Sequence, residues 1–432
     1  MTFNPKALID KNPMTGLQYS TIIICFLMNM LDGMDVLIIS NAAPAISDAW
    51  KLSPAALGIV FSSGLIGMTL GTLFLAPFAD KIGRKAIILI SGIIMGVCIY
   101  LTSYATSITD LLIYRFISGL GIGSMLASTA SLASEYTPNK TRDFWVSFVI
   151  SGYPVGAVLS GLVAAKVIPT DGWQQMFRIA GIASMFSVPL ILFFLSESID
   201  FYLRTQPQNA LEKLNKILGK MNIQPLESLP IIDKIKSKLP VDQLLKTDFK
   251  KPTLQLWAAL FMAFAALYFL TSWIPKLAKD AGLSMELAIY AGTVFNIGAF
   301  FGIITQGYFS SKYGLKKTLG VILVLTGVLM ASFGLFVGSD VILLILALLG
   351  FGIQGGFVGL YALSARLYPT EFRTTGVGWA MGAGRLGGIV GPMIGGLLIG
   401  AGLGIATNFL IFAVPALLSG LITAKIDSKE IS

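Results

Sequence analysis

Apolar runs of about 20 residues recur along the whole chain, and each is long enough to cross the hydrocarbon core of a bilayer as a helix. Only 12% of the 432 residues are charged, whereas soluble domains carry about 25% charged residues. Lipid must therefore solvate most of the chain, which predicts an all-α polytopic membrane protein. The runs lie at 18–42, 54–79, 86–105, 108–134, 144–165, 173–196, 253–275, 286–309, 318–337, 341–365, 374–400 and 404–424.

The basic residues predict which ends of these 12 spans face the cytoplasm. Of the 31 Lys and Arg, 24 lie in the two termini and in the loops that follow even-numbered spans. Cytoplasmic loops carry an excess of Lys and Arg, so we expect both termini in the cytoplasm. Topology thus explains the net charge of +9, and no basic–aromatic patch indicates nucleic-acid binding.

The residue types that catalyse reactions or bind metals are scarce. The chain contains no histidine, and Cys25 and Cys98 both sit within apolar runs, where they serve as small packing residues. No nucleophile–base–acid set is recognisable either. We therefore predict no metal, no cofactor and no enzymatic activity. The polar stretch through Ser20 offers no small-residue cleavage site, so no cleavable signal peptide is expected.

The two groups of six spans repeat each other at an offset of 231 residues. At this spacing Pro138 and Arg142 meet Pro369 and Arg373, and several glycines coincide as well. A parallel repeat of six-helix halves describes one layout of secondary transporters. The predicted organisation is a bundle at 1–196, a cytoplasmic linker at 197–252 and a second bundle at 253–432. A regulatory domain in the linker is the less favoured alternative.

Several motifs resemble the major facilitator superfamily over the whole chain. Residues 76–85 (APFADKIGRK) are similar to its signature between helices 2 and 3, and 307–317 (GYFSSKYGLKK) form a degenerate second copy. The DGxD of 31–35 (LDGMD), together with 384–392 (GRLGGIVGP), resembles the aromatic acid/proton symporters. The resemblance implies a 12-helix major facilitator fold and uptake of benzoate-like carboxylates with protons. We expect a monomer in a bacterial inner membrane, contacting lipid, protons and a small organic acid.

Asp32 and Asp35 are the acidic residues, among 22 in the chain, that lie well inside a predicted span. Their spacing places them on one helix face. A mid-membrane charge costs several kcal/mol, so such residues are functional by default. With no histidine to substitute, these two are the candidate proton carriers. The alternative is a fixed ion pair or a helix cap.

Arg115 and Arg385 are the mid-span cations, while Arg178 lies close enough to one interface to reach water. With both aspartates ionised, the two mid-span arginines are balanced, and with both protonated a positive charge remains. Such a cavity attracts a carboxylate and a proton together. Guanidinium matches a carboxylate bidentately, and Arg385 is the first candidate for the substrate. Arg115 is expected to pair with Asp35, either as part of the site or as an architectural salt bridge.

Asp80, Arg84 and Arg373 are candidates for a gate at the cytoplasmic side. The family resemblance implies that Asp80 latches against the amino end of the helix that carries Arg373, where a negative charge meets the helix dipole. The alternative is ordinary loop charge. Among the aromatics, the candidates for flanking a ring-shaped substrate are Tyr153, Tyr268, Tyr361 and Trp379, although single aromatics in membrane proteins also serve as packing or interface anchors.

Rival functions in the same fold make distinct sequence predictions. A proton-driven exporter of drugs or metabolites would carry a glycine-rich motif in the fifth span, and 152–161 (GYPVGAVLSG) fits that motif only in part. An importer of a neutral sugar has no need of Arg385. A membrane enzyme or receptor ranks last.

Overall fold

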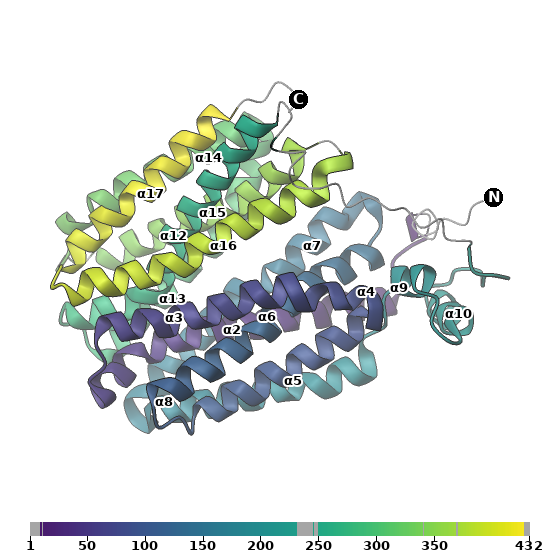
Figure 1. Cartoon of the computed structure of the whole chain (residues 1–432), viewed down its shortest axis with the longest axis horizontal. Helices are drawn as coiled ribbons and strands as arrows, with labels where there is room; N and C mark the ends of the chain where they lie inside the picture. The colour runs from purple at the N-terminus through teal and green to yellow at the C-terminus, as the bar shows by residue number, and fades with distance from the viewer. Residues whose placement is uncertain are drawn as a thin grey trace. The chain divides into compact units, whose positions relative to one another are not determined.

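A computed structural model describes residues 9–10, 12–230, 245, 249–339, 341–368 and 370–426, apart from the side chains of residues 143 and 370–375. Within these ranges every regular element is a helix (Figure 1). The predicted all-α membrane fold is thereby confirmed for the described chain.

The first half of the described chain runs through long helices joined by short turns. Its elements are α2 (Gly16–Trp50), α3 (Pro54–Leu70), η1 (Gly71–Leu75), η2 (Ala76–Phe78), α4 (Ala79–Ile82), α5 (Arg84–Thr102), α6 (Ile108–Tyr136), η3 (Asn139–Thr141), α7 (Arg142–Ile150) and α8 (Gly152–Phe194).

Two short helices follow, and the remaining long helices come after them. These elements are α9 (Ile199–Arg204), α10 (Ala210–Lys220), α12 (Lys250–Asp280), α13 (Met285–Tyr313), α14 (Leu315–Ala331), η4 (Phe333–Phe336), α15 (Ile342–Leu367), α16 (Thr370–Gly400) and α17 (Ile405–Lys425).

Ten helical stretches in the described residues are long and apolar enough to cross a membrane. One of them, Phe144–Phe194, contains two of the expected spans, because the backbone turns at Gly172 with φ of +83°. The α14 helix is also apolar but, with 17 residues, falls just short of the usual spanning length. Dividing the long stretch at Gly172 and including α14 gives the 12 spans that the apolar runs predict.

The packing divides the chain into two compact units. Unit 1 comprises Met1–Val36, Ile66–Gly156 and Gln174–Ile235, and unit 2 comprises Leu37–Leu65, Ala157–Trp173 and Lys236–Ser432. The boundaries cut through α2, α3 and α8, so the end of α2, the beginning of α3 and the middle of α8 belong to the same unit as α12 to α17. The division into 1–196, 197–252 and 253–432 therefore remains a prediction about the sequence repeat.

Residues 197–230 of the predicted linker are folded onto themselves within unit 1. Leu214 and Leu218 of α10 are fully buried. The Asn215 side chain donates to the Leu226 carbonyl at 2.9 Å and accepts from the Leu226 amide at 2.8 Å. These two hydrogen bonds fix the return of the chain after α10. Residues 231–244 and 246–248 of the linker lie outside the described residues.

Glycine permits the closest helix approaches in unit 1, as expected for membrane helices. A Cβ at Gly156 of α8 would collide with the main-chain oxygen of Met30 on α2. In the same way, a Cβ at Gly33 of α2 would collide with the Tyr153 carbonyl of α8. The two helices thus approach each other reciprocally around the turn that carries Asp32.

Gly156→Ala should lower the apparent melting temperature, because the added methyl group forces α8 away from α2. Overpacking of this kind costs about 1–3 kcal/mol. Gly378→Ala is the matched control, since nothing lies within 4 Å of a Cβ built there. We expect a loss of several degrees for the first variant and no loss for the second, measured by intrinsic fluorescence in detergent. Equal melting temperatures would contradict the packing described.

Candidate functional site

The aspartates of α2 lie in the interior of unit 1. Asp35 is fully buried, and Arg115 of α6 is 4% exposed. An Arg115 Nη1 hydrogen donates to Asp35 Oδ1 at 2.6 Å. The expected pairing of Arg115 with Asp35 is therefore confirmed, whereas its role in proton coupling stays a prediction.

Asp32 lies one turn before Asp35 on α2 and is 2% exposed. About one turn earlier on α2, the Asn29 side chain donates to the Thr129 hydroxyl of α6 at 3.0 Å and to the Cys25 carbonyl at 2.9 Å. The contact between α2 and α6 is thus polar over two successive turns. Asn29 could not be predicted as part of this contact, because an uncharged amide in an apolar run carries no topological signal.

Tyr153 reaches the same region from α8. Its main chain contacts Gly33, the residue that follows Asp32. The structure therefore brings four predicted site residues together within unit 1: Asp32, Asp35, Arg115 and Tyr153.

Arg385 lies on α16 in unit 2, beside a cluster of aromatic rings. Phe264 of α12 lies 4.6 Å from Phe357 and 6.4 Å from Tyr361 of α15, between ring centroids. Its ring also stacks on Tyr268 at 5.9 Å. Arg385 lies between Gly384 and Gly388, whose backbone lies against the Phe264 and Tyr268 rings of this cluster.

Two glycines flank Arg385 and make room for the rings. A Cβ at Gly384 would lie 2.6 Å from the Phe264 ring, and one at Gly388 would lie 3.0 Å from the Tyr268 ring. Tyr361 remains 36% exposed. The cluster therefore presents accessible aromatic surface next to a half-buried cation.

Trp379, a further predicted ring-binding residue in unit 2, lies slightly less than two helical turns before Arg385 on α16. It stacks on Trp257 of α12 at 6.1 Å and is 51% exposed. Arg178 of unit 1 lies over the Tyr104 ring at 5.3 Å, which agrees with the expectation that it sits away from the central charges.

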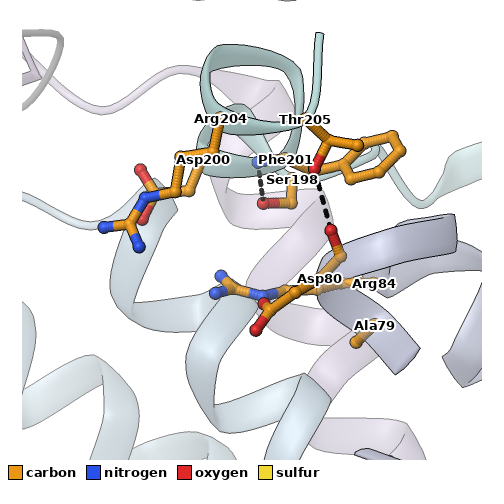
Figure 2. Close-up of a pocket in the computed structure, with 8 residues that line it drawn as sticks. All are labelled: Ala79, Asp80, Arg84, Ser198, Asp200, Phe201, Arg204 and Thr205. Carbon is orange, nitrogen blue, oxygen red and sulfur yellow. Dashed lines mark hydrogen bonds between the residues drawn. The ribbon is translucent and has the colours of Figure 1, made fainter. Parts of the chain in front are cut away.

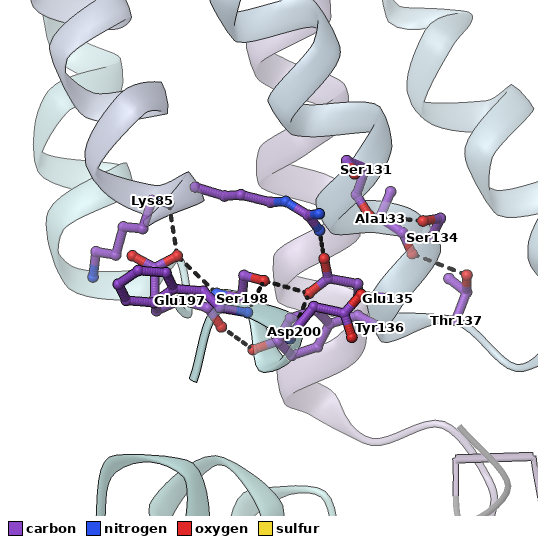
Figure 3. Close-up of polar contacts among 12 residues, drawn as sticks. Lys85, Ser131, Ala133, Ser134, Glu135, Tyr136, Thr137, Glu197, Ser198 and Asp200 are labelled. Carbon is purple, nitrogen blue, oxygen red and sulfur yellow. Dashed lines mark hydrogen bonds and ion pairs between the residues drawn. The ribbon is translucent and has the colours of Figure 1, made fainter. Parts of the chain in front are cut away.

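A second group of charges lies at the end of unit 1 that is predicted to be cytoplasmic. Arg84 of α5 forms an ion pair with Glu135 in the last turn of α6. The other Glu135 oxygen accepts from the Ser198 hydroxyl at 2.7 Å and from the Asp200 amide at 3.4 Å (Figure 3). Glu135 is 4% exposed, so this carboxylate joins α5, α6 and α9 from a buried position.

Glu197 completes this group by capping α5 from another part of the chain. Its Oε1 accepts from the Lys85 amide at 3.0 Å and from the Ser198 amide at 2.8 Å. Gly83 has φ of +101°, and a Cβ there would collide with the Glu197 carboxylate. Glycine is therefore needed at this turn both for its backbone conformation and for the space that it leaves.

Asp80 and Arg84 line the same pocket (Figure 2). The pocket measures about 190 Å³ and is also lined by Asp200 and Arg204. The Thr205 hydroxyl donates to the Asp80 carbonyl at 2.8 Å. The predicted partner Arg373 lies outside the residues whose side chains are described, so the latch stays a prediction.

Sequence reasoning missed Glu135 as a site residue. The signal that could have identified it is its position: Glu135 is an acidic residue close to Pro138, at the end of a predicted span that is expected to face the cytoplasm. Topology alone explains cations at such an end but does not explain an anion.

The chain matches the Major Facilitator Superfamily over residues 25–307 and 256–430. The chain belongs to this superfamily. A 4-hydroxybenzoate transporter of Pseudomonas putida is 31% identical to it over 96% of this chain and 93% of the relative. A benzoate transport protein of Acinetobacter baylyi is 32% identical over 97% of this chain and 91% of the relative. These relatives are named as transporters of aromatic acids, and together with the apolar helices of this chain they indicate a multi-pass membrane protein.

Solved structures share the fold of this major facilitator protein. A D-xylose–proton symporter superposes with a TM-score of 0.74 at 18% identity, over 96% of this chain and 98% of the other. The xylose transporter of E. coli in an inward open conformation gives a TM-score of 0.75 at 17% identity, with the same coverage. At this level of identity the likeness concerns the fold alone.

Glu197→Gln should change how stability depends on pH. Burial raises the pKa of the Glu197 carboxyl, and the Lys85 and Ser198 amides oppose that rise. A raised pKa in the folded state favours the protonated form, so its stabilising contribution is full below the unfolded pKa and is lost as pH rises through the folded pKa. The amide resembles the protonated acid and does not titrate.

The melting temperature of the parent, relative to that of Glu197→Gln, should therefore fall as pH increases from 4.5 to 8. A thermal scan at half-unit pH steps measures it. Two parallel curves would mean that Glu197 titrates as it does in the unfolded chain.

Proposed function

We propose that this protein takes up a small aromatic carboxylate, such as benzoate or a hydroxybenzoate, together with protons, by alternating access. The proposal places it in a bacterial inner membrane as a monomer with both termini in the cytoplasm. The relatives named for 4-hydroxybenzoate and benzoate support the substrate class. The observation that carries the proposal is the cation beside a partly accessible ring cluster in unit 2.

Arg385 suits the carboxylate of such a substrate. Its guanidinium offers two parallel N–H donors to a carboxylate, which gives both energy and orientation. The adjacent Phe264, Phe357 and Tyr361 rings meet edge to face or at a tilt. An additional aromatic ring can join that arrangement at the usual centroid spacing of about 4.5–7 Å. One end of the substrate then binds the cation and the other binds the rings.

The Asp35–Arg115 pair suits proton coupling. While Asp35 is ionised, the guanidinium is neutralised inside unit 1 and has little attraction for an anion. Protonation of Asp35 leaves the Arg115 charge uncompensated in a region without water, where an unpaired charge is costly. Binding of a substrate carboxylate relieves that cost. Proton binding and anion binding therefore favour each other, as symport requires.

Arg385→Lys should raise the apparent KM for the aromatic acid by roughly ten- to a hundredfold, because one charge-assisted hydrogen bond of about 1.5–3 kcal/mol is lost. Arg385→Ala should abolish acid binding in the folded protein. Equilibrium binding and counterflow in proteoliposomes, with benzoate and 4-hydroxybenzoate as ligands, measure both effects. Arg366→Ala is the control, since this arginine is exposed at the end of α15. Unchanged acid binding by Arg385→Ala would move the anion site, first of all to Arg115.

Asp32→Asn and Asp35→Asn should separate exchange from accumulation. An amide resembles the protonated acid in shape and charge, so counterflow of substrate should persist. Neither amide can release a proton, and uptake driven by a pH gradient alone should fail in the variant that removes the coupling group. We expect the larger loss from Asp35→Asn, because Asp35 binds Arg115 directly. Asp48→Asn, at the exposed end of the same helix, controls for loss of an acidic residue.

If both variants still concentrate substrate under a pH gradient, these aspartates are structural. Counterflow against cationic drugs and neutral sugars tests the rival functions. Efficient exchange of a drug without exchange of an aromatic acid would favour the exporter.

A further inference from the structure

Two prolines interrupt equivalent helices of the repeat. Pro44 lies inside α2 and Pro275 inside α12, separated by the same 231 residues that relate the two halves. Proline has no N–H, so the carbonyl four residues earlier loses its helical donor. The carbonyls concerned are those of Ser40 and Thr271. Within a bilayer such a carbonyl needs another donor from the protein.

Ser40 supplies that donor to α12. Its Oγ lies 2.7 Å from the Thr271 carbonyl oxygen and 2.9 Å from that of Ser272. Ser40 is 2% exposed, and all three residues belong to unit 2. A hydroxyl from the first half of the sequence thus satisfies a carbonyl that a proline has freed in the second half.

The donation runs in one direction only. Thr271 occupies the position in α12 that Ser40 occupies in α2, yet among the described residues its buried Oγ1 has no hydrogen-bond partner. The equivalent residues of the two repeats therefore have different roles: Ser40 donates from its side-chain hydroxyl, and Thr271 accepts with its main-chain carbonyl.

Uncharged groups make further contacts in this part of unit 2. The Ser62 hydroxyl of α3 donates to the Ile389 carbonyl of α16 at 2.7 Å. The fully buried Trp273 donates its Nε1 hydrogen to the Pro392 carbonyl at 3.0 Å and meets Phe61 edge to face at 5.1 Å. Hydrogen bonds from hydroxyl and indole groups to main-chain carbonyls thus join the unit 2 parts of α2 and α3 to α12 and α16.

We propose that the Ser40 hydroxyl and the Pro275-freed carbonyl of Thr271 form a clasp that holds this end of the transporter closed. The clasp rests on the proposed function only in that the protein alternates between two conformations. Opening must separate α2 from α12, and the carbonyl then needs water in place of Ser40. The clasp gives the closed, dry state a specific hydrogen bond while placing no fixed charge on the route of an anion.

Ser40→Ala should shift the conformational equilibrium toward the open form at this end by roughly tenfold, a change that corresponds to about 1.4 kcal/mol. The readout is the distance distribution between nitroxides at Ala49 and Glu286, both exposed, in nanodiscs and without substrate. Cys25 and Cys98 are first replaced by serine. Because no substrate is present, the outcome does not depend on which acid the protein carries.

Three variants serve as matched controls. Ser40→Thr keeps the hydroxyl and should keep the distribution of the parent. Thr271→Val removes the hydroxyl that makes no bond here and should also leave the distribution unchanged. Ser62→Ala removes a similar hydrogen bond, but its acceptor Ile389 retains the N–H of Met393, so the shift should be smaller than that of Ser40→Ala.

The decisive test compares Ser40→Ala in the parent protein with Ser40→Ala in a protein that also carries Pro275→Ala. Alanine restores an N–H four residues after Thr271, so its carbonyl no longer needs Ser40. In this background, Ser40→Ala should shift the ratio of open to closed conformations by less than about twofold. The two substitutions affect the same hydrogen bond, so their effects should not add in a double-mutant cycle. An equal shift in both backgrounds would overturn the clasp, as would an equal effect of Ser62→Ala and Ser40→Ala. If Ser40→Ala alone fails to fold, its recovery by Pro275→Ala supports the proposal and continued misfolding contradicts it.

Discussion

The absence of water around the spans is the constraint on which the rest of this structure depends. Every backbone N–H and carbonyl in hydrocarbon must find a partner within the protein, so the described spans are helices. Side chains can add polar bonds only where another group accepts them. This is why the interior hydroxyls of Ser40 and Ser62 bind main-chain carbonyls, and why the freed carbonyl at Thr271 has a donor at all.

The same constraint sorts the charges into two kinds. Asp35 and Arg115 are buried mid-span and neutralise each other at 2.6 Å. Glu135 and Glu197 lie at a helix end, where Arg84 and backbone amides of α5 and α9 compensate them. The first kind can change a cavity's charge by moving one proton. The second kind joins three helices and a turn, so it suits a structural role at that end of unit 1.

The sequence predicted the spans well, because hydropathy measures what lipid requires. It predicted their ends less well, because an apolar run can continue beyond the last residue of an α-helix, and hydropathy does not show where the backbone conformation changes. The run at 318–337 shows this: α14 ends at Ala331, and the apolar residues that follow form the short helix η4. Similarly, α8 contains two of the expected spans, and the non-helical backbone at Gly172 separates them without an intervening loop.

The site was predictable to the extent that it depends on charge. The pairing of Asp35 with Arg115 follows from their similar depth in neighbouring spans. Glu135 was missed because a carboxylate at a helix end also suits a solvated loop. The ring cluster was predicted only in part, since Tyr268 and Tyr361 were candidates and Phe264 and Phe357 were not. Aromatics are frequent in lipid-facing positions, and only their mutual distances distinguish a cluster from a surface.

The course of the two unit boundaries has a consequence for how the protein is made. All segments of unit 1 precede residue 236, whereas unit 2 needs Leu37–Leu65 and Ala157–Trp173 together with the second half. Chains are synthesised from the amino terminus, and early parts fold first. Unit 1 can therefore assemble while the ribosome is still translating. The ends of α2 and α3, with their serine hydroxyls, must wait in the insertion machinery or the lipid until their acceptors on α12 and α16 emerge.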